Sequence, residues 1–172
     1  KIMKTLLSFF LFVSVIITPA LSQNRIRSEK IIEKINNGEN IDIQNATITG
    51  PLKFISVDDV KVVRNSDSNN KEYHCHVRSA LRFINCTFTG DVVGYFSDDY
   101  SDELFNAMFH EDVVFENCIF RGDVLYKYST FYKAAWFKES EFTEEALFKY
   151  AEFPGETAFN NIVFQEEANF KY

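Results

Sequence analysis

The sequence predicts an all-β solenoid, a coil of short strands wound around one apolar axis. Large apolar residues recur between positions 115 and 170 at alternating steps of five and six, and a small or aliphatic residue stands two positions before each. Neither a helical period near 3.6 nor an ordinary long strand would bury all of them, whereas short strands separated by corners do. The large series consists of Phe115, Phe120, Tyr126, Phe131, Phe137, Phe142, Phe148, Phe153, Phe159, Phe164 and Phe170.

The repeating unit is similar to that of a known family. Residues 140–144 and 151–155 resemble pentapeptide repeats, in which a small residue, a polar residue and a central Leu or Phe precede two polar residues. The resemblance covers residues 104–172 without a break, with shorter pieces at 41–54 and 81–92. It implies a right-handed quadrilateral β-helix with four sides per coil. Because alternate units here carry a sixth residue, we expect coils of 22 residues with two wide corners.

The 22-residue coil length can be checked within the sequence. The dipeptide Lys-Tyr recurs at residues 127–128, 149–150 and 171–172, always at that interval. Residues one coil apart are expected to lie about 4.8 Å apart along the axis. The interior phenylalanines should therefore form stacked columns, each ring pair adding about 0.5–1.5 kcal/mol beyond its buried area.

Residues 1–22 are typical of a secretory signal peptide. Lys1 and Lys4 precede an apolar run, and Ala20 and Ser22 stand at positions −3 and −1 of a cut before Gln23. The run is shorter than the roughly 20 residues that cross a bilayer. We therefore expect a protein that is secreted or held at the cell surface or in the periplasm. It would meet a membrane only through an uncleaved leader.

Residues 23–40 are expected to form an N-terminal helical cap. Ser28 can act as the N-cap of a helix that ends near Gly38, and Ile31, Ile32 and Ile35 share one face. The first coil of a solenoid would otherwise expose its backbone edge to water. The helix is predicted to cover that end.

Residues 41–172 are assigned to the coil, with insertions near 55–80 and 95–103. The first insertion predicts a protruding β-hairpin with its tip at 65–70, and the second predicts an acidic loop. The repeat reaches Tyr172 without a capping sequence. We therefore expect that the native chain continues, or that two copies meet end to end as a homodimer.

The net charge of −7 disfavours nucleic acid and anionic lipid as direct partners. Cys86 and Cys118 occupy small inward positions and are expected to be buried thiols. Cys75 falls outside the repeat and is expected to be exposed.

The only cluster of metal-capable side chains is His74-Cys75-His76. On a strand, His74 and His76 would share one face and suit zinc or copper, but two ligands do not make a site, and His110 is remote in sequence. We interpret the segment as a hairpin stem and predict no metal site.

Three acidic residues, Asp123, Glu145 and Glu167, should stack at one corner and repel one another. A divalent cation held between coils could relieve that repulsion. The lysines four positions further along each coil are the simpler explanation.

The Lys-Tyr recurrence is the candidate interaction surface. Such a strip could stack against sugars or receive a partner protein, or its tyrosines could simply pair with one another. Its residues are Lys127, Tyr128, Lys149, Tyr150, Lys171 and Tyr172.

The sequence contains no recognisable catalytic arrangement, and we predict no catalytic residue and no cofactor. Asn45 and Asn85 begin glycosylation sequons at matching corner positions. The expected function is a secreted, non-enzymatic scaffold that binds a protein or a glycan. The resemblance suggests an alternative, an acidic β-helix that imitates DNA and binds a topoisomerase or another DNA-binding protein. A polysaccharide-active enzyme is a poorer match.

Overall fold

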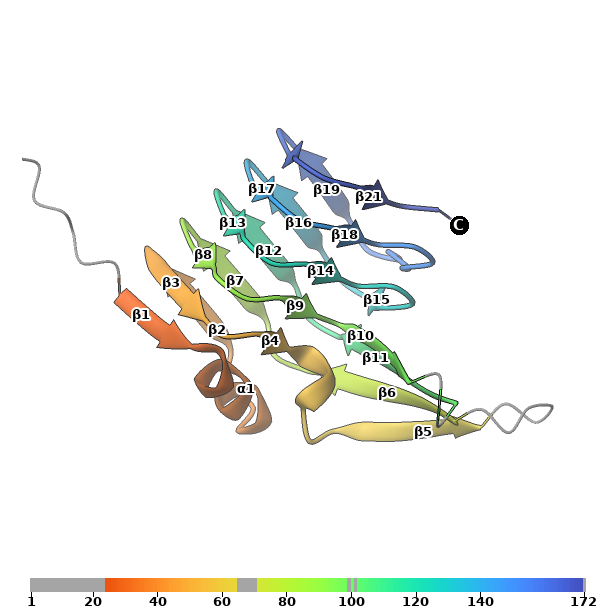
Figure 1. The fold of residues 1–172 in the computed structure, drawn as a ribbon. Coiled ribbons are helices and arrows are strands. Elements are labelled where there is room, and N and C mark those ends of the chain that lie inside the picture. The colour runs from red at the N-terminus through yellow and green to blue at the C-terminus, as the bar shows by residue number, and fades with distance from the viewer. Residues whose placement is uncertain (1–23, 65–70, 99, 101, 172) are drawn as a thin grey trace, which may run out of the picture.

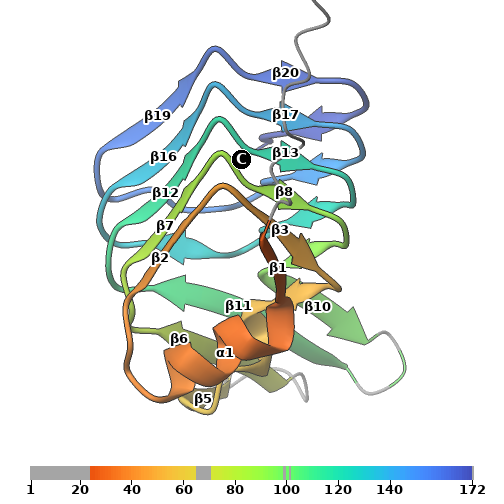
Figure 2. The same ribbon diagram turned by 90° about the vertical axis from the view of Figure 1, so that its left-hand side faces the viewer.

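The computed structural model describes residues 24–64, 71–98, 100 and 102–171. The predicted signal peptide, the tip of the first hairpin and Tyr172 lie outside these residues. The described chain forms a solenoid of stacked coils, and each coil passes through four sides in turn (Figures 1 and 2).

Sides 1 and 2 are parallel sheets. Side 1 contains β2 (Ile41–Gln44), β7 (Leu81–Ile84), β12 (Val113–Glu116), β16 (Ala135–Lys138) and β19 (Thr157–Asn160). Side 2 contains β1 (Asn24–Arg27), β3 (Ala46–Thr49), β8 (Thr87–Phe88), β13 (Ile119–Phe120), β17 (Glu141–Phe142) and β20 (Val163–Phe164).

Side 3 is also parallel, whereas side 4 is mixed. Side 3 contains β4 (Leu52–Lys53), β9 (Val92–Val93), β14 (Val124–Leu125), β18 (Ala146–Leu147) and β21 (Ala168–Asn169). Side 4 contains β5 (Val60–Arg64), β6 (Lys71–Val77), β10 (Tyr95–Asp98), β11 (Glu103–Phe109) and β15 (Thr130–Phe131). A short 3₁₀ helix, η1 (Phe54–Ser56), follows β4.

Strand pairing has the predicted register. Val113 pairs with Ala135, and Ala135 pairs with Thr157, so successive upper coils are 22 residues apart. Lower in the solenoid, Leu81 pairs with Val113 and Ile41 with Leu81, across 32 and 40 positions. The extra residues belong to the two insertions, which leave the coil and return to it in register.

The predicted columns of inward side chains are present. Phe109 stacks on Phe131 with ring centroids 4.6 Å apart, and Phe120 stacks on Phe142 at the same separation. These four rings are buried. The column of side 1 consists of Ile43, Phe83, Phe115, Phe137 and Phe159.

The four corners are of two kinds, as the alternating step predicts. At the corners of the five-residue steps the chain turns through a residue with positive φ, such as Asn117 (51°) or Tyr128 (57°). At the wider corners an acidic side chain accepts a hydrogen bond from a backbone N–H of the next coil. Asp91 accepts from Asp123 at 3.1 Å, and Asp123 accepts from Glu145 at 3.2 Å.

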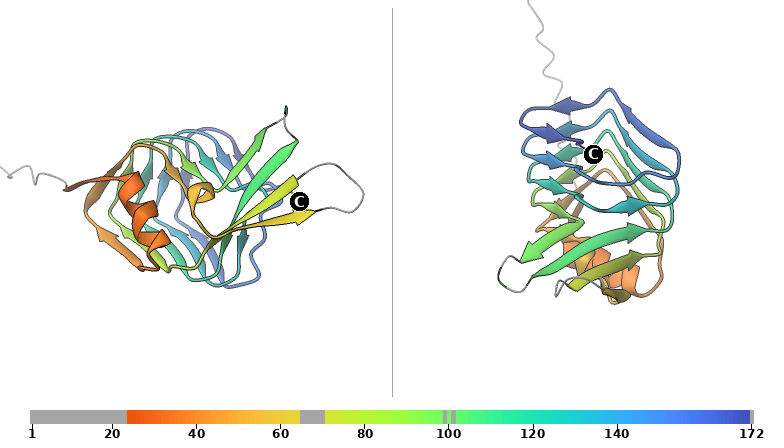
Figure 3. Two further views of the ribbon diagram at one scale, coloured as in Figure 1. Left: turned by 90° about the horizontal axis from the view of Figure 1, so that it is seen from below. Right: turned by 90° about the vertical axis from the view of Figure 1, so that its right-hand side faces the viewer.

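Helix α1 (Ser28–Asn36) packs against the first coil, with Ile31 and Ile35 buried in the common core (Figure 3). The expected capping role of Ser28 is wrong. Arg27 is the N-cap and makes no side-chain capping bond, whereas Ser28 is buried and its hydroxyl has no hydrogen-bond partner among the described residues. Packing against the coil therefore fixes the start of the helix in place of a side-chain cap.

Strand β1 was not expected. It lies in the segment predicted as helical cap, yet it pairs in parallel with β3, and Ile26 lies opposite Ile48. This spacing is again 22 residues. Side 2 therefore begins one coil earlier than the sequence analysis placed it.

Both insertions are antiparallel hairpins. The β5–β6 stem confirms the first prediction, but the second insertion, expected as an acidic loop, pairs β10 with β11. Strands β6 and β11 then pair in parallel, so the order is β10-β11-β6-β5. We call these four strands the projecting sheet, because they extend beyond the coil (Figure 3).

The expected exposure of Cys75 is also wrong, because its side chain is buried. The reason is that β6 has two roles. Its first residues form the hairpin stem, whereas Cys75 and Val77 are opposite Ala107 and Phe109 and form side 4 of the coil. The coil register therefore resumes within β6, before Arg78.

The described part of the chain is a mainly β structure with four-sided coils and one α-helix. Within it, no helix has the length and hydropathy needed to span a membrane. The right-handed sense of the coil stays a prediction.

Candidate functional site

The predicted Lys-Tyr surface forms a ladder whose members contact one another. Tyr128 and Tyr150 stack with ring centroids 5.2 Å apart and planes 16° apart. The ammonium groups of Lys127 and Lys149 each lie 4.9 Å from the ring centroid of the following tyrosine. The ring faces are therefore largely occupied from within the protein, in agreement with the self-pairing interpretation.

Tyr95 extends this ladder by one coil and was missed in the sequence. Lys127 donates a hydrogen bond to its hydroxyl at 3.3 Å, and its ring centroid is 5.9 Å from that of Tyr128. Lys171 continues the ladder at the other end, where its carbonyl accepts from the backbone N–H of Tyr150. Tyr172 lies outside the described residues.

A second aromatic surface crosses the projecting sheet. In the strand register Val62 is opposite Tyr73, Tyr73 is opposite Phe105, and Phe105 is opposite Phe96. These four side chains form one row on one face, which we call the apolar row. Tyr73 and Phe105 stack at 4.4 Å with planes 7° apart.

The ends of the apolar row are open to solvent. Val62 is 53% exposed and Phe96 is 49% exposed. In the middle of the row, the Tyr73 hydroxyl donates to Glu103 at 2.8 Å, and this hydrogen bond raises the pKa of Tyr73. The bond fixes the tyrosine ring against Phe105 and keeps the row in one orientation.

Exposed apolar side chains concentrate in the two hairpins. Five of the eight large apolar residues exposed among the described residues occur there, namely Val60, Val62, Val63, Phe96 and Tyr100. Three of them belong to β5, which is an edge strand. An edge with so much exposed apolar surface is unusual unless something covers it.

The histidines form a cluster at the base of the projecting sheet, where His110 was expected to be remote. His76 Nδ1 lies 2.7 Å from His110 Nε2, and the His110 ring stacks on Tyr132 at 5.0 Å. His74 instead contacts Glu72 at 3.0 Å. No group of three metal-capable side chains that could hold an ion occurs among the described residues.

Burial lowers the pKa of both His76 and His110. A hollow of about 370 Å³ beside His76 is also lined by Asp59 and Arg78. These two side chains pair with each other at 2.7 Å, an interaction that lowers the pKa of Asp59. The histidine pair therefore lies where the first hairpin joins the coil.

The expected pairing of the acidic column with lysines is wrong. Lys127 and Lys149 lie over tyrosine rings, and no ion pair joins them to Asp123 or Glu145 in the described residues. Asp123 instead accepts a backbone hydrogen bond from the next coil. This bond gives the carboxylate a structural role at the wide corner.

The two sequon asparagines, Asn45 and Asn85, are neighbours at one narrow corner. Both have positive φ, and Asn85 Nδ2 donates to Asn45 Oδ1 at 3.0 Å. Asn117 continues this amide ladder by donating to Asn85 at 2.7 Å.

Comparison with known proteins supports the resemblance noted in the sequence. The family described as pentapeptide repeats (9 copies) matches residues 126–172. This match confirms the expected repeats in the upper coils, whereas the pieces at 41–54 and 81–92 lie outside it. The comparison found no match among curated proteins or solved structures.

Proposed function

We propose, from the pentapeptide repeats of residues 126–172 and the exposed projecting sheet, that this protein is a secreted, non-enzymatic scaffold that binds a partner protein. In this proposal the coil is a right-handed quadrilateral β-helix capped by α1. Repeats of this kind are generally structural and not catalytic. The apolar row is the observation that carries the proposal.

The ring geometry favours a protein over a glycan as the partner. Sugars bind aromatic side chains through exposed flat ring faces. In the apolar row, Tyr73 and Phe105 cover each other's faces, and in the ladder Tyr128 and Tyr150 do the same. What the row offers is ring edges and the aliphatic Val62, which suit apolar side chains of another protein.

The shape of the edge strand supports the same proposal. β5 presents Val60, Lys61, Val62 and Val63, all exposed, beside a free strand edge. A partner segment in extended conformation could add a strand there and place alternate apolar side chains over the apolar row.

The acidic surface gives the DNA-mimic alternative less support than the sequence suggested. Its corner carboxylates of Asp91 and Asp123 already accept backbone hydrogen bonds, so the stacked acids have a structural explanation. That alternative would also require the cytoplasm. Fractionation of host cells that placed the mature protein with cytosolic markers would favour it.

The test compares two double variants as bait in pull-downs from the host's extracellular fraction. Val62→Ser with Phe96→Ser changes exposed ends of the apolar row, and Tyr128→Ser with Tyr150→Ser changes the ladder. We expect the first variant to lose the partner that the wild type retains, and the second to keep it. Thermal unfolding by circular dichroism would establish that each bait is folded.

The opposite pattern would contradict the proposal. Retention of the partner by the row variant together with its loss by the ladder variant would place the contact on the ladder. Elution of the partner by free oligosaccharides would identify a glycan-mediated interaction.

A further inference from the structure

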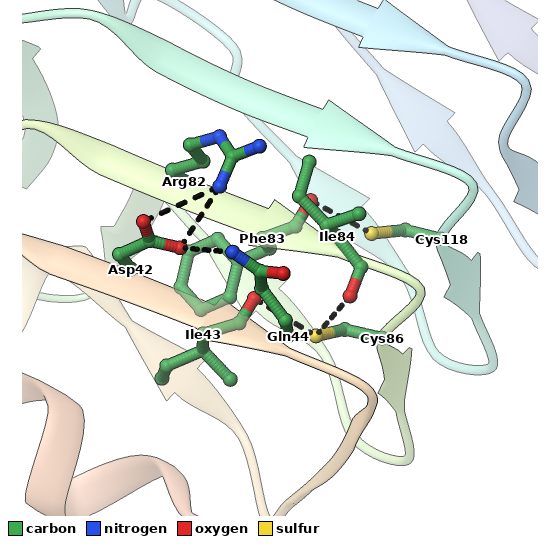
Figure 4. Close-up of polar contacts among 8 residues, drawn as sticks. All are labelled: Asp42, Ile43, Gln44, Arg82, Phe83, Ile84, Cys86 and Cys118. Carbon is green, nitrogen blue, oxygen red and sulfur yellow. Dashed lines mark hydrogen bonds and ion pairs between the residues drawn. The ribbon is translucent and has the colours of Figure 1, made fainter.

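Two cysteines occupy the same position on successive coils. Thr87 pairs with Ile119, which places Cys86 directly beneath Cys118. The backbone N–H of Ile119 donates to the carbonyl of Cys86 at 2.9 Å, so the two coils are tightly joined here. Figure 4 shows both sulfurs beside the ends of β2 and β7.

The backbone geometry satisfies the requirements for a disulfide bond. Neighbouring strands lie about 4.8 Å apart, within the range of roughly 4.4–6.8 Å that disulfides span between Cα atoms. Cys86 and Cys118 both fill the small inward position of side 2, so their Cβ atoms point in the same direction. No change in the course of the backbone is needed to bring the sulfurs together.

The two thiols also interact chemically. Cys86 Sγ lies 3.3 Å from the carbonyl oxygen of Ile84, and Cys118 Sγ lies 3.4 Å from that of Phe83. A hydrogen bond between the thiols lowers the pKa of Cys86 to about 7 and raises that of Cys118. The physical reason is that the first thiolate to form is stabilised by the remaining S–H group, which then ionises less readily.

We propose that Cys86 and Cys118 form a disulfide bond that joins two successive coils when the protein folds in the presence of a small-molecule disulfide such as oxidised glutathione. The Cys86 thiolate attacks the external disulfide and releases one thiol. The Cys118 sulfur loses its proton and displaces the second. Two S–H bonds and one external S–S bond break, one protein S–S bond and two external thiols form, and the oxidant takes up two electrons.

Cys75 provides an internal control. It lies on side 4, whereas the proposed pair lies on side 2, and burial raises its pKa to about 11. It therefore lacks both a neighbouring cysteine and an accessible thiolate. The proposal requires Cys75 to remain a free thiol.

The bridge would connect the coil before the second hairpin to the coil after it. Residues 87–117, which include β10 and β11, lie between the two cysteines. Closing this loop restricts the unfolded chain and so favours the folded one. The inference does not depend on the proposed partner.

The experiment refolds the reduced full chain in glutathione redox buffer, alkylates free thiols under denaturing conditions, and maps peptides by mass spectrometry. We expect a single alkylated cysteine, Cys75, and a linked pair of peptides containing Cys86 and Cys118. Folded protein with three alkylated cysteines would overturn the proposal. So would any linkage that includes Cys75.

A matched variant tests the structural effect. In the same column the residue after Cys118 is Ser140, which the coil already accommodates, so Cys118→Ser should fold. The wild type is expected to melt roughly 5 °C higher in its oxidised than in its reduced form. Cys118→Ser should show no such difference, and an equal difference in the variant would contradict the bridge.

Discussion

The body of the solenoid and its projecting sheet use aromatic residues in opposite ways. In the body, rings such as Phe115 and Phe137 are fully buried in stacked columns, whereas Phe96 of the projecting sheet is 49% exposed. The repeated coils bury apolar surface, and the residues that interrupt them expose it. The comparison indicates that stability and recognition are located in different parts of the chain.

The two surface stripes repeat this contrast. The ladder of Tyr128 and Tyr150 follows the coil period, and each ring has a neighbour one coil away. The apolar row lies where the period is broken, and Val62 at its end has no next strand to pack against. Exact repetition therefore produces surfaces that satisfy themselves, whereas an insertion leaves surface for a partner.

The largest effect expected concerns the body. Phe137→Ala should lower the free energy of unfolding by about 3–5 kcal/mol, because the ring is buried and stacks on Phe115 and Phe159. Urea unfolding measures this loss. Phe96→Ala is the matched control on the projecting sheet and should cost less than about 1 kcal/mol. Equal losses would break the comparison.

A smaller effect is expected at Gly94, where the body takes up the second insertion. A Cβ atom there would lie 2.5 Å from the Tyr126 ring, so Gly94→Ala should cost about 1–3 kcal/mol through overpacking. Adding Tyr126→Leu should recover part of the loss in urea unfolding, since it removes the atoms that clash. A double variant no more stable than expected from adding the two single losses would contradict this cause.

The smallest effect concerns the histidine pair at the boundary between the two regions. Burial lowers the pKa of His76 and His110 in the folded protein, so the unfolded chain takes up protons first as the pH falls. The stability linked to the pair is therefore complete above the ordinary histidine pKa of about 6.5 and declines below it. Because the rings are partly exposed, we expect a loss below about 1 kcal/mol.

Hydrogen exchange at pH 7.5 and pH 5.5 would test this dependence on pH. Asp59, Lys61, Arg78 and Glu111 also act on the pair, so the variant His110→Gln serves as the reference. Amides of β6 should exchange faster at the lower pH in the wild type and change less in the variant. Faster exchange throughout side 1 would show that the effect is not confined to the boundary.

The sequence predicted the body well because its information is redundant. Every coil states the same spacing, so columns such as Phe131 over Phe109 follow from counting residues. The 22-residue interval also places Ile26 opposite Ile48 and would have revealed β1, but one apolar residue beside a predicted leader carries little signal.

The candidate site was harder to predict, because pairing across insertions has no fixed interval. The segment of β10 has an acidic, loop-like composition, and its strand conformation depends on β11, which in turn pairs with β6. The contact of His76 with His110 arises from that same pairing. Ser28 was misassigned because capping was judged from residue type, and its burial follows from tertiary packing.

The wide corners have a consequence for how such a protein behaves in solution. Asp91, Asp112 and Asp123 each accept a backbone hydrogen bond from the following coil, so each added coil tends to bring a further anionic side chain. Negative charge then increases with the length of the solenoid. Longer versions of this architecture would repel one another more strongly in dilute buffer, and added electrolyte would weaken that repulsion.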